Sequence, residues 1–188
     1  MMKKPKIKIS NIIFAIIILL LLIPQTRQPI QLFFHKGLAR ISPSTISDSD
    51  QEKLINYNWN LVDQNGEQFN LEHSKGKVVF INFWATWCPP CIAEMPSIDA
   101  LYKDYNDKIV FLLVSDEPKE VIKAFNDKNN FSFNFYNSVS PAPSSFKTRS
   151  IPRTFIVDKS GNIVMDKGGA ANWNSETVRT TLDKLLSE

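Results

Sequence analysis

The sequence is poor in the residues from which metal sites and disulfide scaffolds are built. Its 188 residues include only two cysteines and two histidines. A single pair of cysteines excludes a disulfide-rich scaffold. The histidines, His35 and His73, show no partner pattern, so no metal site is predicted. With 43% hydrophobic and 22% charged residues, the chain can bury a core, which excludes wholesale disorder.

Acidic residues are absent from the beginning of the chain. Residues 1–41 carry seven lysines and arginines and no aspartate or glutamate, whereas the rest carries 15 basic and 19 acidic residues. The net charge of +3 therefore combines a basic leader with a mildly acidic domain. Such a domain lacks the cationic surface that phosphate backbones require, so nucleic acid is not an expected partner.

The leader contains a long apolar run, from Ile12 to Ile23, which Pro24 stops. Counted from Ile7, the span has 17 residues, which is the short limit for crossing a bilayer. The alternative is a cleaved signal peptide, whose apolar region has about 7 to 15 residues. Because no small-residue cleavage pattern follows the run, the sequence favours a retained transmembrane helix that anchors the chain in the membrane.

Basic residues give this helix an orientation. Four lysines precede the apolar run, and positive charge stays on the cytoplasmic side. We therefore expect a cytoplasmic N-terminus and a catalytic domain in the periplasm or another extracytoplasmic space. The predicted division is a stub and transmembrane anchor over residues 1–24, a juxtamembrane segment and linker over 25–56, and a folded domain over 57–188.

The juxtamembrane segment allows two interpretations. Apolar residues recur there at helical spacing: Ile30, Phe33, Phe34, Leu38 and Ile41. They could form an amphipathic helix on the membrane surface, or they could continue the anchor or pack on the domain. The stretch from Pro43 to Asp50, rich in serine and aspartate, predicts a flexible tether.

Strand and helix patterns alternate from about residue 58 onwards. Asn65-Gly66 suits a tight turn, and Pro118 suits the first turn of a helix. The predicted elements are a hairpin (59–62 and 68–71), a buried strand (78–84), a helix (88–105), a strand (109–114), a helix (118–128), a second hairpin (155–157 and 162–165) and a terminal helix capped by Ser175. This pattern predicts an α/β fold with a central mixed sheet flanked by helices and an N-terminal β-hairpin.

The chemistry is concentrated where the first buried strand meets its helix. Trp87-Cys88-Pro89-Pro90-Cys91 places two cysteines at the start of the helix, where they can close a disulfide and where the helix N-terminus stabilises a thiolate. Cys88 should be the outer thiol and Cys91 the more buried one. A staple across so short a loop should contribute less than the roughly 3 kcal/mol of a 15-residue loop, so redox exchange is the favoured interpretation.

Two segments resemble a known family. Asn82-Phe83-Trp84-Ala85-Thr86-Trp87-Cys88-Pro89-Pro90-Cys91, with Glu94 and Pro96 after it, resembles the membrane-anchored TlpA/ResA branch of the thioredoxin superfamily. Ile151-Pro152-Arg153-Thr154-Phe155 resembles the loop that carries the superfamily's cis-proline. The resemblance implies a thioredoxin-like fold, an extracytoplasmic location and thiol-disulfide oxidoreductase activity, often in cytochrome c maturation. It implies no cofactor beyond the redox-active disulfide.

The resemblance also implies roles for individual residues. Cys88 is the attacking cysteine, and Cys91 resolves the mixed disulfide. Glu94 shares a helical face with Cys91, so burial should raise its pKa towards the range useful for proton transfer. The alternative is an acid that faces solvent and only complements the helix dipole. Asn82 stands where thioredoxin has a buried aspartate and cannot shuttle a proton.

The remaining predicted site residues contact the substrate. Pro152 is expected to be cis and to face the disulfide, which exposes the backbone of Ile151 to an extended substrate. Trp87, Pro89 and Pro90 complete this surface. Arg153 stands where the family more often has threonine, which predicts an altered substrate preference. Trp84 and Trp173 are interpreted as packing residues.

The predicted function is reduction of disulfides in exported proteins, with electrons supplied by a membrane-embedded donor. The alternatives are a disulfide oxidase or isomerase of the same fold, a thiol peroxidase, and a copper(I)-binding module that uses both thiolates. The dipeptide between the cysteines does not settle the direction of electron flow.

Overall fold

The computed structural model describes residues 8–22, 32, 37 and 39–188. Helix α1 (Ile9–Leu22) has 14 residues. Among the described residues, no helix is long and apolar enough to cross a membrane. The two ends of the predicted 17-residue span, Ile7 and Ile23, lie outside the described residues.

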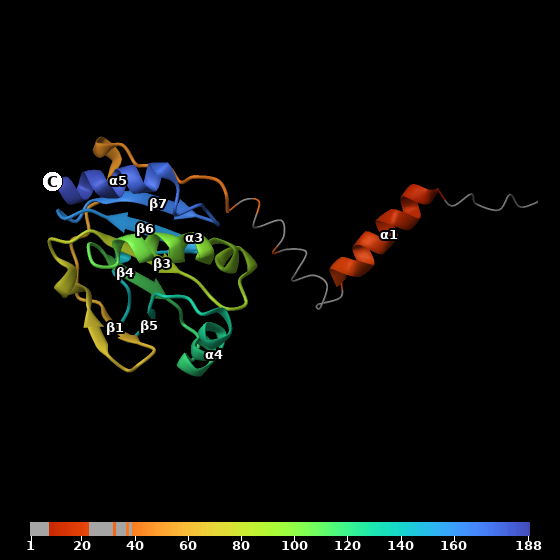
Figure 1. The fold of residues 1–188 in the computed structure, drawn as a ribbon, viewed down its shortest axis with the longest axis horizontal. Helices are drawn as coiled ribbons and strands as arrows, with labels where there is room; N and C mark the ends of the chain where they lie inside the picture. Colours follow the sequence, from red (N-terminus) through yellow and green to blue (C-terminus); the bar gives the residue numbers. More distant parts are fainter. Residues whose placement is uncertain (1–7, 23–31, 33–36, 38) are drawn as a thin grey trace, which may run out of the picture.

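A mixed sheet forms the centre of the folded domain (Figure 1). In the part of the chain that the structure describes, its strand order is β2-β1-β5-β4-β3-β6-β7. β3 pairs in parallel with β4, and β4 with β5, whereas the other neighbours are antiparallel. The strands are β1 (Asn60–Asp63), β2 (Gln68–Asn70), β3 (Val79–Phe83), β4 (Val110–Val114), β5 (Phe135–Ser138), β6 (Arg153–Val157) and β7 (Ile163–Gly168).

Both faces of the sheet are buried, as its apolar central strands require. Along β3, Phe80 joins one core cluster, while Val79 and Ile81 join the other. The first cluster includes residues from the three domain helices, which are α3 (Pro89–Tyr105), α4 (Lys119–Asn129) and α5 (Glu176–Ser187). The second cluster includes residues from the short 3-10 helices η2 (Leu71–Ser74) and η3 (Ser144–Phe146). The predicted thioredoxin-like arrangement of a mixed sheet flanked by helices is confirmed.

The predicted elements match the observed ones to within a few residues, with one omission. Both hairpins, both buried strands and the three domain helices are present. Strand β5 was not predicted. It pairs with β4 on one side and with β1 on the other, so it joins the N-terminal hairpin to the central sheet.

The stretch predicted to be a flexible tether runs along the domain instead. The Ile46 N–H donates to the Val164 carbonyl at 2.8 Å, and the Ile163 N–H donates to the Glu52 carbonyl at 2.8 Å. The prediction of a tether between Pro43 and Asp50 is therefore wrong, because edge strand β7 offers backbone groups that this stretch satisfies. The division of the chain at residues 24 and 56 stays a prediction.

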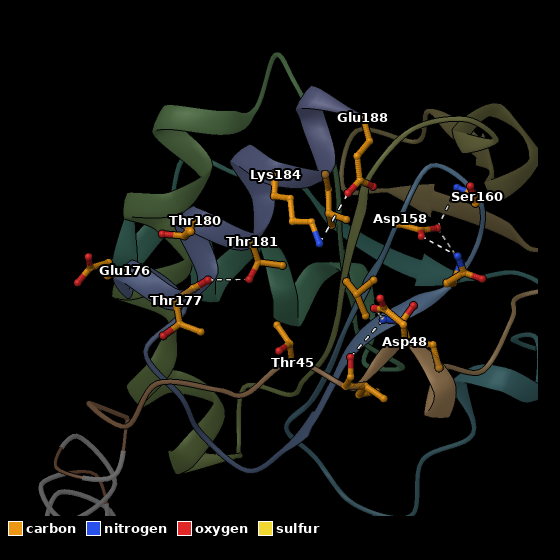
Figure 2. Close-up of a pocket in the computed structure, with 15 residues that line it drawn as sticks. Thr45, Asp48, Asp158, Ser160, Glu176, Thr177, Thr180, Thr181, Lys184 and Glu188 are labelled. Carbon is orange, nitrogen blue, oxygen red and sulfur yellow. Dashed lines mark hydrogen bonds and ion pairs between the residues drawn. The ribbon is translucent and has the colours of Figure 1, made fainter.

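A polar pocket of about 810 Å³ lies between this stretch and α5 (Figure 2). Its walls carry hydroxyl and charged side chains, among them Thr45, Asp48, Thr181 and Lys184. Neither cysteine lines it. This pocket is thus separate from the thiol chemistry.

The amphipathic helix predicted around Ile30 to Ile41 lies mostly outside the described residues. At its end, Ala39 is buried and the Ile41 carbonyl accepts from the Asn172 N–H at 2.9 Å. This end of the segment therefore packs on the domain, which was one of the two interpretations left open.

Candidate active site

The two cysteines lie where β3 gives way to α3. Cys88 is the N-cap of the helix, and its Sγ accepts from the Cys91 N–H at 3.3 Å. Pro89 and Pro90 occupy the first helical positions, where a missing N–H costs no helical hydrogen bond. The sequence therefore begins the helix at the CxxC motif, and the helix N-terminus points at the sulfur atoms.

Cys88 and Cys91 form a disulfide, with their Cα atoms 5.3 Å apart. Cys88 is 3% exposed and Cys91 is fully buried. The predicted order of exposure is thus observed, although the difference is small. The neighbouring Trp87 is 66% exposed. We call the side of the disulfide on which this indole ring lies the open side.

Glu94 lies one helical turn after Cys91 and is fully buried. Three N–H groups donate to its carboxylate. Asn82 Nδ2 lies 2.8 Å from Oε1, while Trp173 Nε1 and the Ala171 N–H lie 2.9 and 3.1 Å from Oε2. The alternative of a solvent-facing acid at this position is therefore wrong.

Burial raises the pKa of Glu94 from 4.5 to about 7. Desolvation is the largest cause, and the three hydrogen bonds oppose it because they favour the ionised form. Residues three apart on a helix are neighbours on one face, so Glu94 and Cys91 face the same side of α3. A carboxyl group that titrates near neutral pH can accept the proton of a buried thiol there.

Asn82 holds Glu94 from β3. Its Nδ2 donates both to Glu94 Oε1 and to Thr154 Oγ1, the latter at 2.7 Å, and so ties α3 to β6. Among the described residues, its Oδ1 atom has no hydrogen-bond partner although it is buried. Asn82 therefore orients the carboxyl group but carries no proton itself.

Trp173 does more than the packing predicted from the sequence. It is fully buried and meets the ring of Phe80 edge-on at 5.2 Å, which is the expected packing role. Its indole N–H is also one of the three donors to Glu94. No local sequence signal identifies this contact, because the two positions are 79 apart in the sequence.

The predicted cis peptide bond between Ile151 and Pro152 is present. Pro152 is buried, and Ile151 packs against the core cluster that contains both cysteines. Arg153 next to them makes a bidentate ion pair with Asp166, with both N–O distances at 2.5 Å. This ion pair holds the Arg153 side chain against β7.

Two pockets flank Trp87 on the open side of the disulfide. One, of about 280 Å³, is walled by Trp84, Ile151 and Glu117 among others. The other, of about 380 Å³, has Pro89 and Ile92 among its lining residues. Of the residues predicted to contact substrate, Trp87, Pro89 and Ile151 therefore line these two pockets, whereas Pro90 and Pro152 line neither.

Sequence reasoning missed Glu117. It follows β4, and its carboxylate accepts from the backbone N–H and the hydroxyl of Thr86, two residues before Cys88. In the sequence, Glu117 is an acidic residue between Asp116 and Pro118, outside any predicted strand or helix. It comes next to the active-site loop only when the chain folds.

Comparisons with known proteins agree with this geometry. A family model described as Redoxin matches residues 45–185. The chain is 32% identical to thiol-disulfide oxidoreductase ResA of Bacillus thuringiensis subsp. konkukian over 134 residues, which are 70% of this chain and 74% of that protein. It is 34% identical to the thioredoxin-like protein YneN of Bacillus subtilis over 109 residues, which are 56% of this chain and 64% of that protein.

Among solved structures, one from Bacteroides vulgatus assigned as a thiol-disulfide oxidoreductase is 35% identical. It superimposes with a TM-score of 0.57, covering 67% of this chain and 90% of that one.

Proposed function

The chain belongs to the Redoxin family and its folded domain is that of a thiol-disulfide oxidoreductase, and on this premise we propose that it reduces disulfides of exported proteins. Apocytochrome c is a candidate client. The observation that carries the proposal is the CxxC disulfide at the start of α3 with a buried carboxyl group one turn behind it.

The reduced site can transfer two electrons through these residues. The Cys88 thiolate attacks one client sulfur, the other client sulfur leaves as a thiolate, and a mixed disulfide forms. Glu94 then takes the proton of the Cys91 thiol, and Cys91 attacks Cys88 Sγ. The bond between Cys88 Sγ and the client breaks, and the client sulfur that Cys88 had attacked leaves as a thiolate. Both client thiolates take up protons, so the client becomes a dithiol and the enzyme a disulfide.

Each turnover leaves the enzyme oxidised, so it needs an outside source of two electrons. We propose a membrane-embedded dithiol donor, because a reductase outside the cytosol must be supplied across the membrane. The same residues run in reverse would oxidise a client dithiol, so an oxidase or isomerase remains the alternative. The midpoint potential of the disulfide decides between them.

We also propose that the apolar leader is a retained anchor that holds the domain outside the cytosol. The support is the apolar run with four lysines before it, together with the large apolar side chains of α1, such as Ile9, Ile12 and Phe14, which are exposed. Protease treatment of sealed spheroplasts tests this: the domain should be cleaved while a cytoplasmic marker survives. Protection of the domain would contradict the orientation.

The activity is tested with the full chain in detergent micelles. Reduction of insulin by dithiothreitol should accelerate in its presence, and the C91S variant should accumulate as a mixed disulfide with the client. A full chain that consumes peroxide but leaves insulin untouched would instead favour a thiol peroxidase. Binding of copper(I) without insulin turnover would favour the metal-binding alternative.

A further inference from the structure

A second carboxylate, that of Glu117, lies at the active-site loop. We propose that Glu117 is a positioning residue that holds this loop in the conformation in which clients dock. The inference rests on the proposed function, because it concerns how the same site receives a client.

Both carboxylate oxygens of Glu117 accept hydrogen bonds from Thr86 of the loop, and Oε2 also accepts from Ser115 Oγ at 3.4 Å. Its Oε2 accepts from the Thr86 backbone N–H at 2.6 Å, and its Oε1 accepts from Thr86 Oγ1 at 2.7 Å. Hydrogen bonds to an ionised acceptor are roughly twice as strong as neutral ones. Among the described residues, the Thr86 N–H and hydroxyl donate to no other group.

The sheet holds Glu117 itself in place. Asn137 on β5 donates from Nδ2 to the Ser115 carbonyl at 2.7 Å and to the Glu117 carbonyl at 2.8 Å. The Glu117 N–H also donates to Ser115 Oγ at 3.3 Å. The carboxylate is therefore presented by a turn that two neighbouring strands fix, which makes it a rigid support.

The loop that Glu117 supports forms the open side of the active site. Thr86 directly precedes the exposed Trp87, and Cys88 follows as the N-cap of α3. Glu117, Trp87 and Ile151 also line the same pocket beside the disulfide. If the support is lost, the loop can shift, and a misplacement of about 1 Å can cost on the order of 100-fold in rate.

An acid nearby in the sequence provides a matched control. Glu120 carries the same charge three residues later, is exposed, lines neither pocket beside Trp87 and makes no hydrogen bond to the loop among the described residues. E120Q therefore removes a charge from the same segment without removing the support. E117Q keeps the shape and one acceptor oxygen, and E117A removes both acceptors.

The experiment uses the full chain in micelles and two readouts. The first is kcat/KM for insulin reduction, and the second is the rate at which iodoacetamide alkylates the reduced protein at Cys88. We expect E117A to lower kcat/KM by about 10-fold or more and E117Q by less, with alkylation within about twofold of wild type. E120Q should leave both readouts within about twofold.

Three results would overturn the inference. They are wild-type kcat/KM in E117A, an equal loss in E120Q, which would indicate a general charge effect, and a parallel fall in alkylation, which would indicate a damaged site. A wild-type chain that does not reduce insulin would refute the proposed function, and the inference with it. Wild-type activity combined with an unaffected E117A refutes the inference alone.

Discussion

The buried and the open side of the disulfide differ in burial and in hydrogen bonding. Behind the sulfur atoms, Glu94 is fully buried and its carboxylate is held by three N–H donors. In front, Trp87 is 66% exposed between two pockets. On the proposed function, the buried side transfers the proton and the open side receives the client.

Glu94 and Glu117 differ in their surroundings in the same way. Burial raises the pKa of Glu94 to about 7, so this carboxyl group can exchange a proton at neutral pH. Glu117 is only partly buried, and both of its carboxylate oxygens accept from Thr86. On the roles that we propose, the same residue type serves proton transfer in one position and positioning of the loop in the other, because its surroundings differ.

The largest effect should come from the cysteines, which both sides share. C88A should reduce insulin turnover to the rate of free dithiothreitol, because no attacking thiolate remains. C91S should also abolish turnover but trap the client on Cys88, visible as a higher-mass band on a non-reducing gel. Normal turnover in either variant would contradict the proposed mechanism.

The next largest effect should come from E94Q, which removes the proton acceptor on the buried side. General base catalysis contributes about 10²- to 10⁴-fold, so kcat for client release should fall by at least 10²-fold above pH 7. The ratio of wild-type to E94Q activity should rise through pH 7, because only wild type gains a carboxylate there. A ratio that does not change with pH would remove Glu94 from the proton transfer.

The same variant makes a prediction about stability. The folded-state pKa of Glu94 is raised, so its contribution is fully present below the unfolded value of 4.5 and is lost as pH rises through about 7. The wild-type free energy of unfolding should therefore fall relative to E94Q by about 3 kcal/mol between pH 4.5 and 8. Urea denaturation of the oxidised proteins at both pH values measures this. A difference independent of pH would contradict the raised pKa.

A smaller effect is expected from W173F, which keeps most of the ring but removes one donor to Glu94. Because that donor favours the ionised form, its loss should raise the pKa of Glu94 further and move the activity step up by about one pH unit. The pH profile of insulin reduction measures the step. A step that stays in place, in a variant of normal stability, would show that Trp173 only packs.

The smallest effect is expected from R153T beside the open side. Arg153 is held by Asp166 at the partly exposed surface, where such pairs contribute about 0 to 1 kcal/mol. Stability should therefore change by about 1 kcal/mol or less, and insulin kcat/KM by about twofold or less. A large change in client preference would support the prediction made from the sequence, that this residue alters specificity.

The parts of the fold with a local signal were predictable from the sequence. The CxxC motif after an apolar strand located the disulfide, and the apolar stripe of α3 predicted that Glu94 is buried. The Asn65-Gly66 turn and the loop from Asp158 to Gly161 located the hairpins. Each of these features depends on residues within about one helical turn or one hairpin of one another.

The parts that depend on distant partners were not predictable. Strand β5 is short and half polar, and it is a strand because β1 and β4 lie on its two sides. The stretch around Ile46 resembles a tether until edge strand β7 offers it hydrogen bonds. Trp173 and Glu117 reach the active site only through the topology of the sheet, so one sequence gives no local signal for either contact.

The central claim is that Cys88 and Cys91 form a reversible redox couple that donates electrons to clients. A redox titration of the full chain in micelles against dithiothreitol and glutathione buffers, read by thiol alkylation, tests it most directly. We expect one two-electron transition. Its midpoint potential should lie closer to about −270 mV, the value of a reductant such as thioredoxin, than to that of a strong oxidant. A midpoint near about −120 mV, or no reversible transition, would contradict the claim.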